Sequence, residues 1–424
     1  MPQIKPFRGV LYNPEKTKIN DVVAPPYDVI SQQQQTMLYD RNPHNIVRLI
    51  LNRDQDPYSS AATHLKQWFS EHVLLPDSEP SIYVMSQQFK LPNGKNVERM
   101  GFIIACLIEE FGNGSIFPHE KTHSGPKADR LNLFQATGMM FSQIFGLYSD
   151  DQHILDKHIS NATSSPPQID VVYDNVRNQL WKLRDEVPIN TITEYIRTQK
   201  VYIADGHHRY ETALQYRNAS RLKNPQHTGK EAYNFVPMFL TNMNDPGLVI
   251  LPTHRLLHSI PNFRLQEFLN ELEKYFMVDA FDSQETMLQK LHETQHHSYG
   301  LFLEGHTTCW LLTFRKTIKQ KRLSTVEIIM NQLDVTILHS IIFNVILGMT
   351  DEQQEKKLFL EYEKDTQQAI AMVQEHKSQA AFIMNSTRIE QMRAVASVGT
   401  VMPQKSTYFY PKLLSGLVLY SFND

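Results

Sequence analysis

One stretch of the sequence, residues 201–214 (VYIADGHHRYETAL), constrains the fold more than any other part of the chain. An apolar run from Val201 to Ala204 ends in Asp205-Gly206, and a segment with helical spacing follows. This order predicts a strand, a tight glycine turn and the N-terminus of a helix. Because the first N–H groups of a helix lack intrahelical partners and carry a partial positive charge, the turn is a candidate anion site.

The side chains at this turn carry chemistry of their own. His207, His208 and Arg209 follow Gly206, and with the helix N-terminus they favour phosphate as the anion. Asp205, at the end of the strand, is a candidate metal ligand or a residue that orients a histidine. The alternative is a surface turn whose polar residues are merely solvated.

The overall composition excludes some classes of protein. A chain of 424 residues is too long for one core, so we expect two or three domains. The formal net charge is −3 and no long basic run occurs, which argues against a nucleic-acid-binding surface. Without a recognisable secretory leader or an apolar run of membrane-spanning length, we expect a cytoplasmic protein that does not bind membranes. Cys106 and Cys309 lie in apolar strand-like stretches, which predicts buried thiols and neither a metal pair nor a disulfide.

Short apolar segments that alternate with helical ones predict a mixed α+β fold, with several small sheets and surrounding helices. Two hairpins are indicated, one by residues 81–90 with 96–108 and one by residues 299–303 with 309–314. Residues 335–347 are apolar nearly all round, which predicts a buried helix.

A second polar cluster runs from His119 to Arg130. Its centre, Ser124-Gly125-Pro126, predicts a loop that reaches over a phosphate, with His119 or Glu120 as a general acid or base. The candidate phosphate-binding residues of this loop are His119, Ser124, Lys127 and Arg130. The alternative is a solvated loop that is rich in charges.

The same cluster contains a literal HExxH pattern at residues 119–123. That pattern binds zinc only when a helix places both histidines on one face. Pro118 just before it and residues 124–126 just after it disfavour such a helix, so we do not expect a zinc protease.

Three shorter motifs add candidates. Asp28 lies on a loop that Pro25 and Pro26 make rigid, so it is a candidate substrate or metal ligand, although capping of the next helix is equally open. Residues 253–255 (THR) follow an apolar strand, and Lys405 lies in a Lys-Ser-Thr run that could complete an anion site. For these two motifs a purely structural role is equally open.

Taken together, the clusters are typical of a phosphate-handling enzyme. In phosphoryl transfer the protein mainly positions groups and neutralises charge with Lys, Arg, His and backbone N–H groups. Asp or Glu then holds Mg²⁺ or activates the attacking oxygen. The sequence therefore predicts an enzyme that uses Mg²⁺ and acts on a small phosphorylated molecule.

Five motifs resemble a bacterial and archaeal family, the domain-of-unknown-function 1015 family, over almost the full length of the chain. The string ADGHHRYETA is also similar to the phosphate-binding box of the ParB/sulfiredoxin-like superfamily, one branch of which is the archaeal free-serine kinase. The five motifs are VVAPPYDVI (22–30), NPHNIVRLIL (42–51), HEKTHSGPKADRL (119–131), IADGHHRY (203–210) and MPQKSTYFYPK (402–412).

This resemblance implies a ParB/sulfiredoxin-like phosphate-binding core in residues 1–230 and a second, α/β-type region in residues 231–424 that completes or covers the site. It also implies that Gly206, His208 and Arg209 contact phosphate as their counterparts do in sulfiredoxin. His207 stands where sulfiredoxin has its catalytic cysteine, and without a thiol the reduction of a sulfinic acid is ruled out. His207 is then either a phosphoryl acceptor or general acid, or simply a hydrogen-bond donor to phosphate.

The function that we expect is therefore a kinase or phosphatase acting on serine or phosphoserine, with a nucleotide or pyrophosphate as phosphate donor. Asp205, His207, His208 and Arg209 would form the cradle, Lys127 and Arg130 would close it, and Glu120 or Asp28 would be the base. Two alternatives stay open: a nucleotide-gated, ParB-like switch, and a regulatory binding protein without catalysis. The second arginine of ParB proteins and a helix-turn-helix are missing, so nucleic acid is not an expected partner; a dimer is compatible with the sequence.

Overall fold

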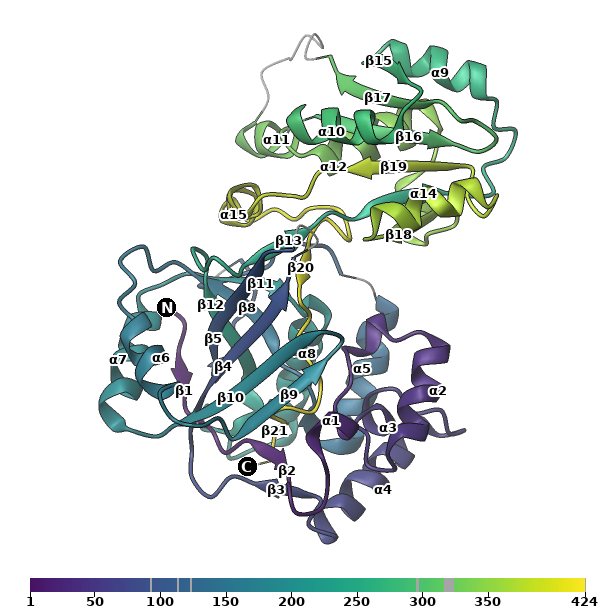
Figure 1. Ribbon diagram of the computed structural model, residues 1–424. Helices are drawn as coiled ribbons and strands as arrows, with labels where there is room; N and C mark the ends of the chain where they lie inside the picture. The colour runs from purple at the N-terminus through teal and green to yellow at the C-terminus, as the bar shows by residue number, and fades with distance from the viewer. Residues whose placement is uncertain (92–93, 113, 123, 295–296, 316–323, 424) are drawn as a thin grey trace. The chain divides into compact units, whose positions relative to one another are not determined.

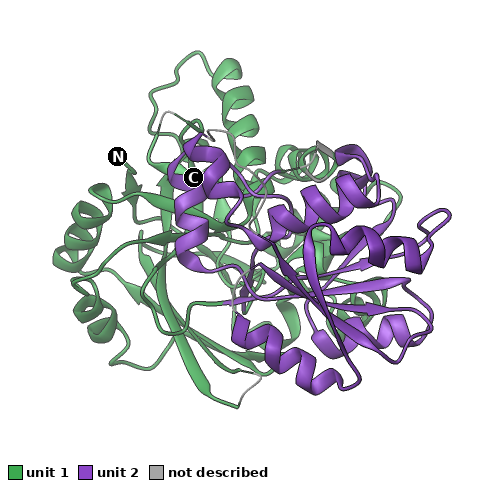
Figure 2. Cartoon of the chain, turned by 90° about the horizontal axis from the view of Figure 1, so that it is seen from above, with its two compact units in different colours: residues 1–118, 122–249, 411–424 green, residues 119–121, 250–410 purple. Residues whose placement is uncertain are grey.

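The computed structural model describes residues 1–91, 94–112, 114–122, 124–294, 297–315 and 324–423 (Figure 1). The chain divides into two units, coloured separately in Figure 2. Unit 1 comprises residues 1–118, 122–249 and 411–424, and unit 2 comprises residues 119–121 and 250–410. We expected the main division after residue 230; these units change over after residue 249, and the C-terminal segment belongs to unit 1.

Unit 1 is built on a mixed sheet of nine strands, counted over the described residues. β12 pairs with β8 and β11 pairs with β6 in parallel, whereas the other neighbours in the sheet are antiparallel. The short strand β1 (Ile4–Lys5) adds to β5. In order across the sheet, the strands are β6 (Ile116–Phe117), β11 (Val201–Asp205), β8 (Ile144–Tyr148), β12 (Phe235–Asn242), β5 (Asn96–Leu107), β4 (Ile82–Lys90), β10 (Val176–Leu183) and β9 (Ile169–Tyr173).

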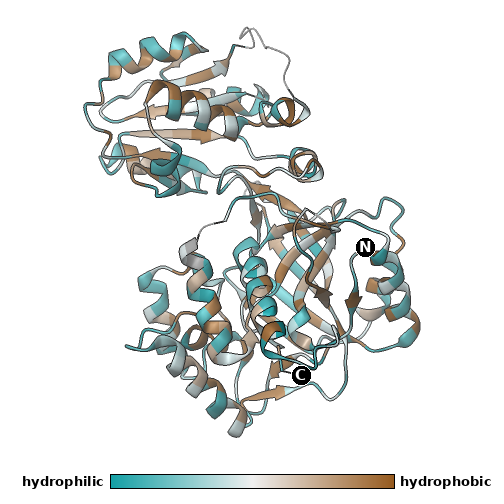
Figure 3. Cartoon of the chain, turned by 180° about the vertical axis from the view of Figure 1, so that it is seen from behind, coloured by the Kyte–Doolittle hydropathy of each residue, from teal (hydrophilic) through white to brown (hydrophobic). Residues whose placement is uncertain are grey.

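The strands at the centre of this sheet are apolar because both of their faces are covered. Every residue of β8 and of β12 is buried. Figure 3 shows brown, hydrophobic segments in the sheet of unit 1. The expected hairpin of β4 and β5 is confirmed by an antiparallel register from Tyr83 opposite Ile103 to Lys90 opposite Asn96. Residues 92 and 93 of its connection lie outside the described residues.

Helices surround the sheet of unit 1, and helices α1 to α4 share a hydrophobic core of their own. α4 begins at Pro57 because Asp56 accepts a hydrogen bond from the Ser59 N–H and proline needs no N–H in the first turn. Its Leu65 and Trp68 pack with buried residues of α2 and α3. The helices are α1 (Ile19–Val22), α2 (Gln32–Arg41), α3 (Val47–Ile50), α4 (Pro57–Ser70), α5 (Ser124–Thr137), α6 (Asp156–Ala162), α7 (Glu186–Arg197) and α8 (His207–Lys223), with 3-10 turns at η1 (Tyr27–Val29) and η2 (Ala232–Asn234). Two short pairs complete the unit: β2 (Val10–Tyr12) with β3 (Leu74–Pro76), and β7 (Met139–Met140) with β21 (Tyr420–Ser421).

Unit 2 contains a six-stranded sheet whose pairs are all antiparallel. The second expected hairpin, β16 with β17, is confirmed. α10 and α14 contribute Met287, Leu291, Ile370 and Val373 to a core with residues of the sheet. In order across the sheet, the strands are β15 (Phe276–Phe281), β17 (Cys309–Phe314), β16 (Ser298–Leu303), β19 (Ala380–Met384), β14 (His254–Leu257) and β18 (Leu360–Glu363). β13 (Val249–Leu251) pairs with β20 (Tyr408–Tyr410), and the helices are α9 (Leu265–Glu273), α10 (Gln284–Thr294), α11 (Thr325–Met330), α12 (Asp334–Ile337), α13 (Asp351–Glu355), α14 (Thr366–Gln374) and α15 (Ile389–Ser397).

The apolar segment 335–347 is helical, as expected, but it is not buried all round. α12 runs directly into a π-helix, η3 (Leu338–Ile346), which is a form often found at functional sites. Leu338, Ile342 and Phe343 are buried, whereas Val345 is 58% exposed. The wider turn of the π-helix thus divides the segment into a core face and an open face.

The α+β class and the two buried thiols, Cys106 and Cys309, are confirmed. Within the described parts of the chain, no helix combines the length and the apolar character that crossing a membrane requires.

Candidate functional site

The turn between β11 and α8 has the predicted form. β11 ends at Asp205, Gly206 is the N-cap residue, and α8 starts at His207. Gly206 has φ +92°, in the left-handed region where a side chain is strained. A β-carbon at this position would lie 3.1 Å from Nε and from a terminal nitrogen of Arg209. Glycine is therefore required both by the backbone angle and by the closeness of the guanidinium.

Substituting Gly206 with alanine should lower the free energy of unfolding of unit 1 by about 2 kcal/mol, because it adds about 1–2 kcal/mol of left-handed backbone strain and crowds Arg209. The matched control is Gly229→Ala, since Gly229 has φ +88° but a β-carbon added there would meet no atom within 4 Å. Urea unfolding measures both changes. Equal losses in the two variants would contradict the contact with Arg209.

Arg209 is the centre of the site in unit 1. Its side chain is 7% exposed and donates to Ser142 Oγ at 2.8 Å, to the Gln143 carbonyl at 2.6 Å and to Asp205 Oδ2 at 2.7 Å. The ammonium group of Lys412 binds the other oxygen, Asp205 Oδ1. One carboxylate at the start of α8 therefore bridges a buried guanidinium and an ammonium group that is 15% exposed.

A second arginine approaches the same place from α5. Arg130 is 6% exposed, binds Asp129 and donates to the Ile50 carbonyl at 2.8 Å, and its guanidinium lies 4.1 Å from the centre of the Tyr27 ring. Tyr27, Arg130 and Arg209 line one small cavity of about 20 Å³. Burial raises the pKa of Tyr27, and the charge of Asp28 raises it further, whereas Arg130 and Arg209 oppose this shift. The proline-rich motif, the second polar cluster and the glycine turn thus meet around Tyr27.

Lys127 lies on α5, and His207 and His208 lie on α8. Lys127 forms an ion pair with Glu211 at 2.6 Å, and the Thr122 hydroxyl donates to the same carboxylate at 2.8 Å. His207 is 7% exposed, and His208 lies in the first turn of α8 with its carbonyl accepting a hydrogen bond from Thr212 Oγ1 at 2.7 Å. Glu211 therefore ties the start of α5 to α8.

Three further candidates, His119, Glu120 and Lys405, form a cluster within unit 2. His119 is fully buried, with Nε2 2.8 Å from Thr407 Oγ1, and its carbonyl accepts from the Met402 N–H at 2.8 Å. Glu120 Oε1 accepts from the Lys405 N–H at 3.0 Å. These contacts join residues 119–121 to the segment before β20, so the roles of His119, Glu120 and Lys405 in phosphate binding stay predictions.

The loop expected around residues 124–126 is instead the first turn of α5, so this expectation was wrong. Proline is tolerated there because the first turn of a helix contains N–H groups without intrahelical partners. Lys127 and Arg130 are consequently helical residues that lie about one turn apart. The side chain of Ser124 lies outside the described part of the structure.

The candidate metal ligands lie in different surroundings. Residues 119–122 are not helical, His123 lies outside the described residues, and no group of three or more His, Cys, Asp or Glu side chains in the described chain could hold a metal. Both oxygens of Asp205 already bind cations, so this carboxylate does not fit a magnesium ligand. Asp28, on η1, stays a prediction as a metal ligand.

Sequence reasoning did not assign roles to several residues of this site. Lys412 was part of a recognised motif, but it lies 207 positions after its partner Asp205, and no local pattern joins the two. Tyr27 directly precedes Asp28 and Glu211 follows Arg209 by two positions, so their closeness in the sequence to candidate residues was an available signal. Ser142 gave no signal of its own.

Comparison with known proteins finds similar solved structures and one matching family. Three similar solved structures each have a TM-score of 0.35. A conserved hypothetical protein from Pyrococcus furiosus is 12% identical over 70% of this chain and 90% of its own. A free serine kinase in complex with AMP is 11% identical over 70% of this chain and 83% of its own, and SbnI with a C-terminal truncation from Staphylococcus aureus is 9% identical over 72% of this chain and 83% of its own. No curated protein sequence gives a significant match. A family model described as a protein of unknown function (DUF1015) matches residues 4–336, and the chain therefore belongs to the DUF1015 family.

Proposed function

We propose that unit 1 binds a phosphate group at the start of α8 and transfers a phosphoryl group to or from a small metabolite. The observation that carries this proposal is the left-handed Gly206 turn, beside which Arg209 and Lys412 share the carboxylate of Asp205. α8 has 17 residues and starts after Gly206, and the partial positive charge of a helix N-terminus favours an anion there.

Asp205 gives the cations a partner when no ligand is bound. A buried guanidinium without a negative partner is costly, and Asp205 supplies that charge from within the chain. A phosphate group offers more oxygens than a carboxylate and matches the fork of Arg209, so it can compete for the same two cations. His207 would donate a hydrogen bond to the phosphate, and His208 would contribute through its place in the first turn of the helix.

The remaining roles follow from position. Arg130 lies close enough to Tyr27 and Arg209 to add positive charge on the other side of the small cavity. Asp28, beside Tyr27, is the carboxylate that we assign to accept the proton of an attacking hydroxyl. Serine or phosphoserine as the metabolite rests on the resemblance of residues 203–210 to the free-serine kinase branch, and a nucleotide or pyrophosphate would be the donor.

Phosphorus NMR of the purified chain tests this proposal. Samples contain Mg²⁺ with L-serine plus ATP, ADP or pyrophosphate, or with phosphoserine alone. We expect either new phosphoserine, which identifies a kinase, or free phosphate from phosphoserine, which identifies a phosphatase. If no sample shows phosphoserine formation or phosphate release, serine is excluded as the substrate. Binding of CTP or another nucleotide without turnover would favour the nucleotide switch.

A pair of lysine variants distinguishes the site from a contaminating activity. Lys412→Met removes a cation from Asp205, so turnover should fall at least about 100-fold, as is usual when a preorganised charge is lost. Lys200→Met is the control, because Lys200 is exposed in unit 1 and its ammonium group lies 5.2 Å from the Phe117 ring. Equal rates in the two variants would place the reaction elsewhere.

A further inference from the structure

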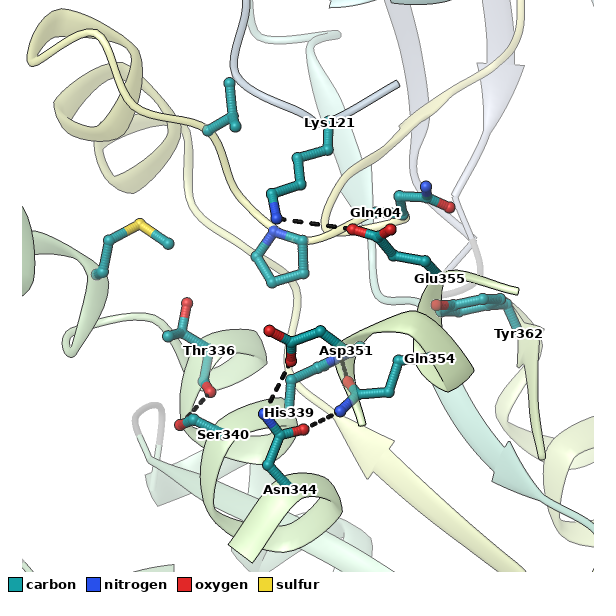
Figure 4. A pocket seen from close by; sticks show the side chains of 13 residues that line it. Lys121, Thr336, His339, Ser340, Asn344, Asp351, Gln354, Glu355, Tyr362 and Gln404 are labelled. Carbon is teal, nitrogen blue, oxygen red and sulfur yellow. Dashed lines mark hydrogen bonds and ion pairs between the residues drawn. The ribbon is translucent and has the colours of Figure 1, made fainter. Parts of the chain in front are cut away.

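A pocket of about 280 Å³ lies within unit 2 and uses none of the residues of the phosphate site (Figure 4). Small-molecule sites begin at about this volume. Four segments form its walls: the helical stretch from α11 to η3, helix α13, strand β18 through Tyr362, and the chain near residue 402 with Lys121 beside it.

The helical wall of the pocket is a polar stripe on an otherwise apolar helix. Thr336 in α12 and Ser340 and Asn344 in η3 recur every four residues, and all three line the pocket. The opposite face packs into the core through Leu338 and Ile342. This division of the helix makes the pocket a formed feature of unit 2.

A chain of hydrogen bonds holds the floor of the pocket in one orientation. Arg255 Nε donates to His339 Nε2 at 3.4 Å, and His339 Nδ1 donates to Gln354 Oε1 at 2.7 Å. Gln354 Nε2 then donates to Asn344 Oδ1, and Asn344 Nδ2 donates to Asp351 Oδ1 at 2.8 Å. Every donor points toward Asp351, so the network fixes that carboxylate at the edge of the pocket and keeps it an acceptor.

The charges that face the pocket are mainly negative. Asp351 and Glu355 are carboxylates, whereas Lys121 is the single ammonium group among the lining residues. None of the described basic side chains pairs with Asp351, whereas Lys121 lies 3.7 Å from Glu355 in a pair of which both side chains are more than half exposed. Such an exposed pair contributes little. Asp351 is thus the carboxylate that a ligand cation can reach without displacing another charge.

Besides Lys121, two basic groups lie near the pocket, and neither of them faces it as a cation. His339 stays neutral, because burial and the neighbouring Arg255 lower its pKa to about 3. Arg255 is 1% exposed and does not line the pocket, since it donates to the Thr253 and Lys405 carbonyls behind it. Met330, Val401, Pro403 and the ring of Tyr362 supply apolar walls.

We propose that this pocket binds a small organic cation, a protonated amine on an apolar or aromatic body, with its ammonium group on Asp351. The ion pair would form at the end of the oriented amide network, and the body of the ligand would lie against the apolar walls. This site is independent of the proposed phosphoryl transfer in unit 1.

Three probes of matched shape and different charge test the proposal on the full chain: phenethylamine, 2-phenylethanol and 3-phenylpropionate. Saturation-transfer NMR titrations measure their affinities. We expect phenethylamine to bind at least about tenfold more tightly than the anion, with the alcohol between them. Equal affinities for the three probes, or preference for 3-phenylpropionate, would overturn the proposal.

Two variants should change the affinity for phenethylamine in opposite directions. Asp351→Asn should weaken binding about tenfold, and its control is Glu352→Gln, which removes an acid from the same first turn of α13 but does not line the pocket. Lys121→Gln should tighten binding, because it leaves Glu355 without its cation. An unchanged affinity in Asp351→Asn, or a weaker one in Lys121→Gln, would exclude the assigned ion pair.

Discussion

Replacing Arg209 with methionine should lower the free energy of unfolding of unit 1 by about 3 kcal/mol. The substitution removes the donor to Ser142 Oγ and to the Gln143 carbonyl, and it takes from Asp205 one of the two cations that it bridges. Polar groups that lose a charged partner inside a protein each cost about 1–3 kcal/mol. Urea-dependent hydrogen exchange, followed by mass spectrometry in peptides from β8 and β12, measures the stability of unit 1 separately.

The control for this prediction is Arg177→Met. Arg177 also binds an aspartate with two hydrogen bonds, to Asp170 at 2.9 and 2.5 Å, but its side chain is 48% exposed. Its loss should therefore change stability by no more than about 1 kcal/mol. Equal effects of the two substitutions would show that the Arg209 contacts do not support the fold. Pyrophosphate at about 100 times its dissociation constant should add about 2.7 kcal/mol to the wild type, and that gain should be absent in Arg209→Met.

Unit 2 should lose about 4 kcal/mol of stability between pH 8 and pH 5, through two buried histidines. Burial and Arg255 lower the pKa of His254 to about 4 and that of His339 to about 3, against about 6.5 in an unfolded chain. A group whose folded pKa is depressed in this way favours folding only while it is neutral. Its contribution is complete above pH 6.5 and falls by about 1.4 kcal/mol per pH unit as the pH drops toward the folded pKa, which gives about 2 kcal/mol for each histidine at pH 5.

The hydrogen bonds explain why neither ring accepts a second proton. The Met384 N–H donates to His254 Nδ1 at 3.2 Å, and Arg255 Nε donates to His339 Nε2 at 3.4 Å. Protonation would place two donors against each other at both positions. Hydrogen exchange in peptides from β16 and β19 measures how the stability of unit 2 depends on pH. In the double variant His254→Gln/His339→Gln, that stability should be nearly constant between pH 8 and pH 5. A slope as steep as that of the wild type would assign the effect to other groups.

Local patterns predicted those parts of the fold that local physics determines. The strand, turn and helix at residues 201–214 follow from an apolar run, a glycine and helical spacing, and the structure has β11, Gly206 and α8 there. The two hairpins are confirmed for the same reason. The start of α5 was missed because Ser-Gly-Pro is typical of turns, although it also suits the first turn of a helix.

Contacts between distant segments could not be predicted in this way. The pairing of Asp205 with Lys412 and the bond from the Lys405 N–H to Glu120 join residues that are 207 and 285 positions apart. The pocket of unit 2 shows a different limit. Its polar stripe at Thr336, Ser340 and Asn344 is visible in the sequence, but the strongly apolar residues around it indicated a buried helix.

The division of the chain has a consequence for its synthesis on the ribosome. Unit 1 includes residues 411–424, which supply Lys412 to Asp205 and the strand β21 to β7. During translation, the ribosome therefore makes the 161 residues 250–410 before the N-terminal part of unit 1 can contact residues 411–424. A nascent chain that stops before Pro411 holds all the residues of unit 2 and the whole β11–α8 turn, yet it lacks Lys412, the second cation that binds Asp205. Synthesis of residues 411–424 is thus the step that supplies the second cation to Asp205.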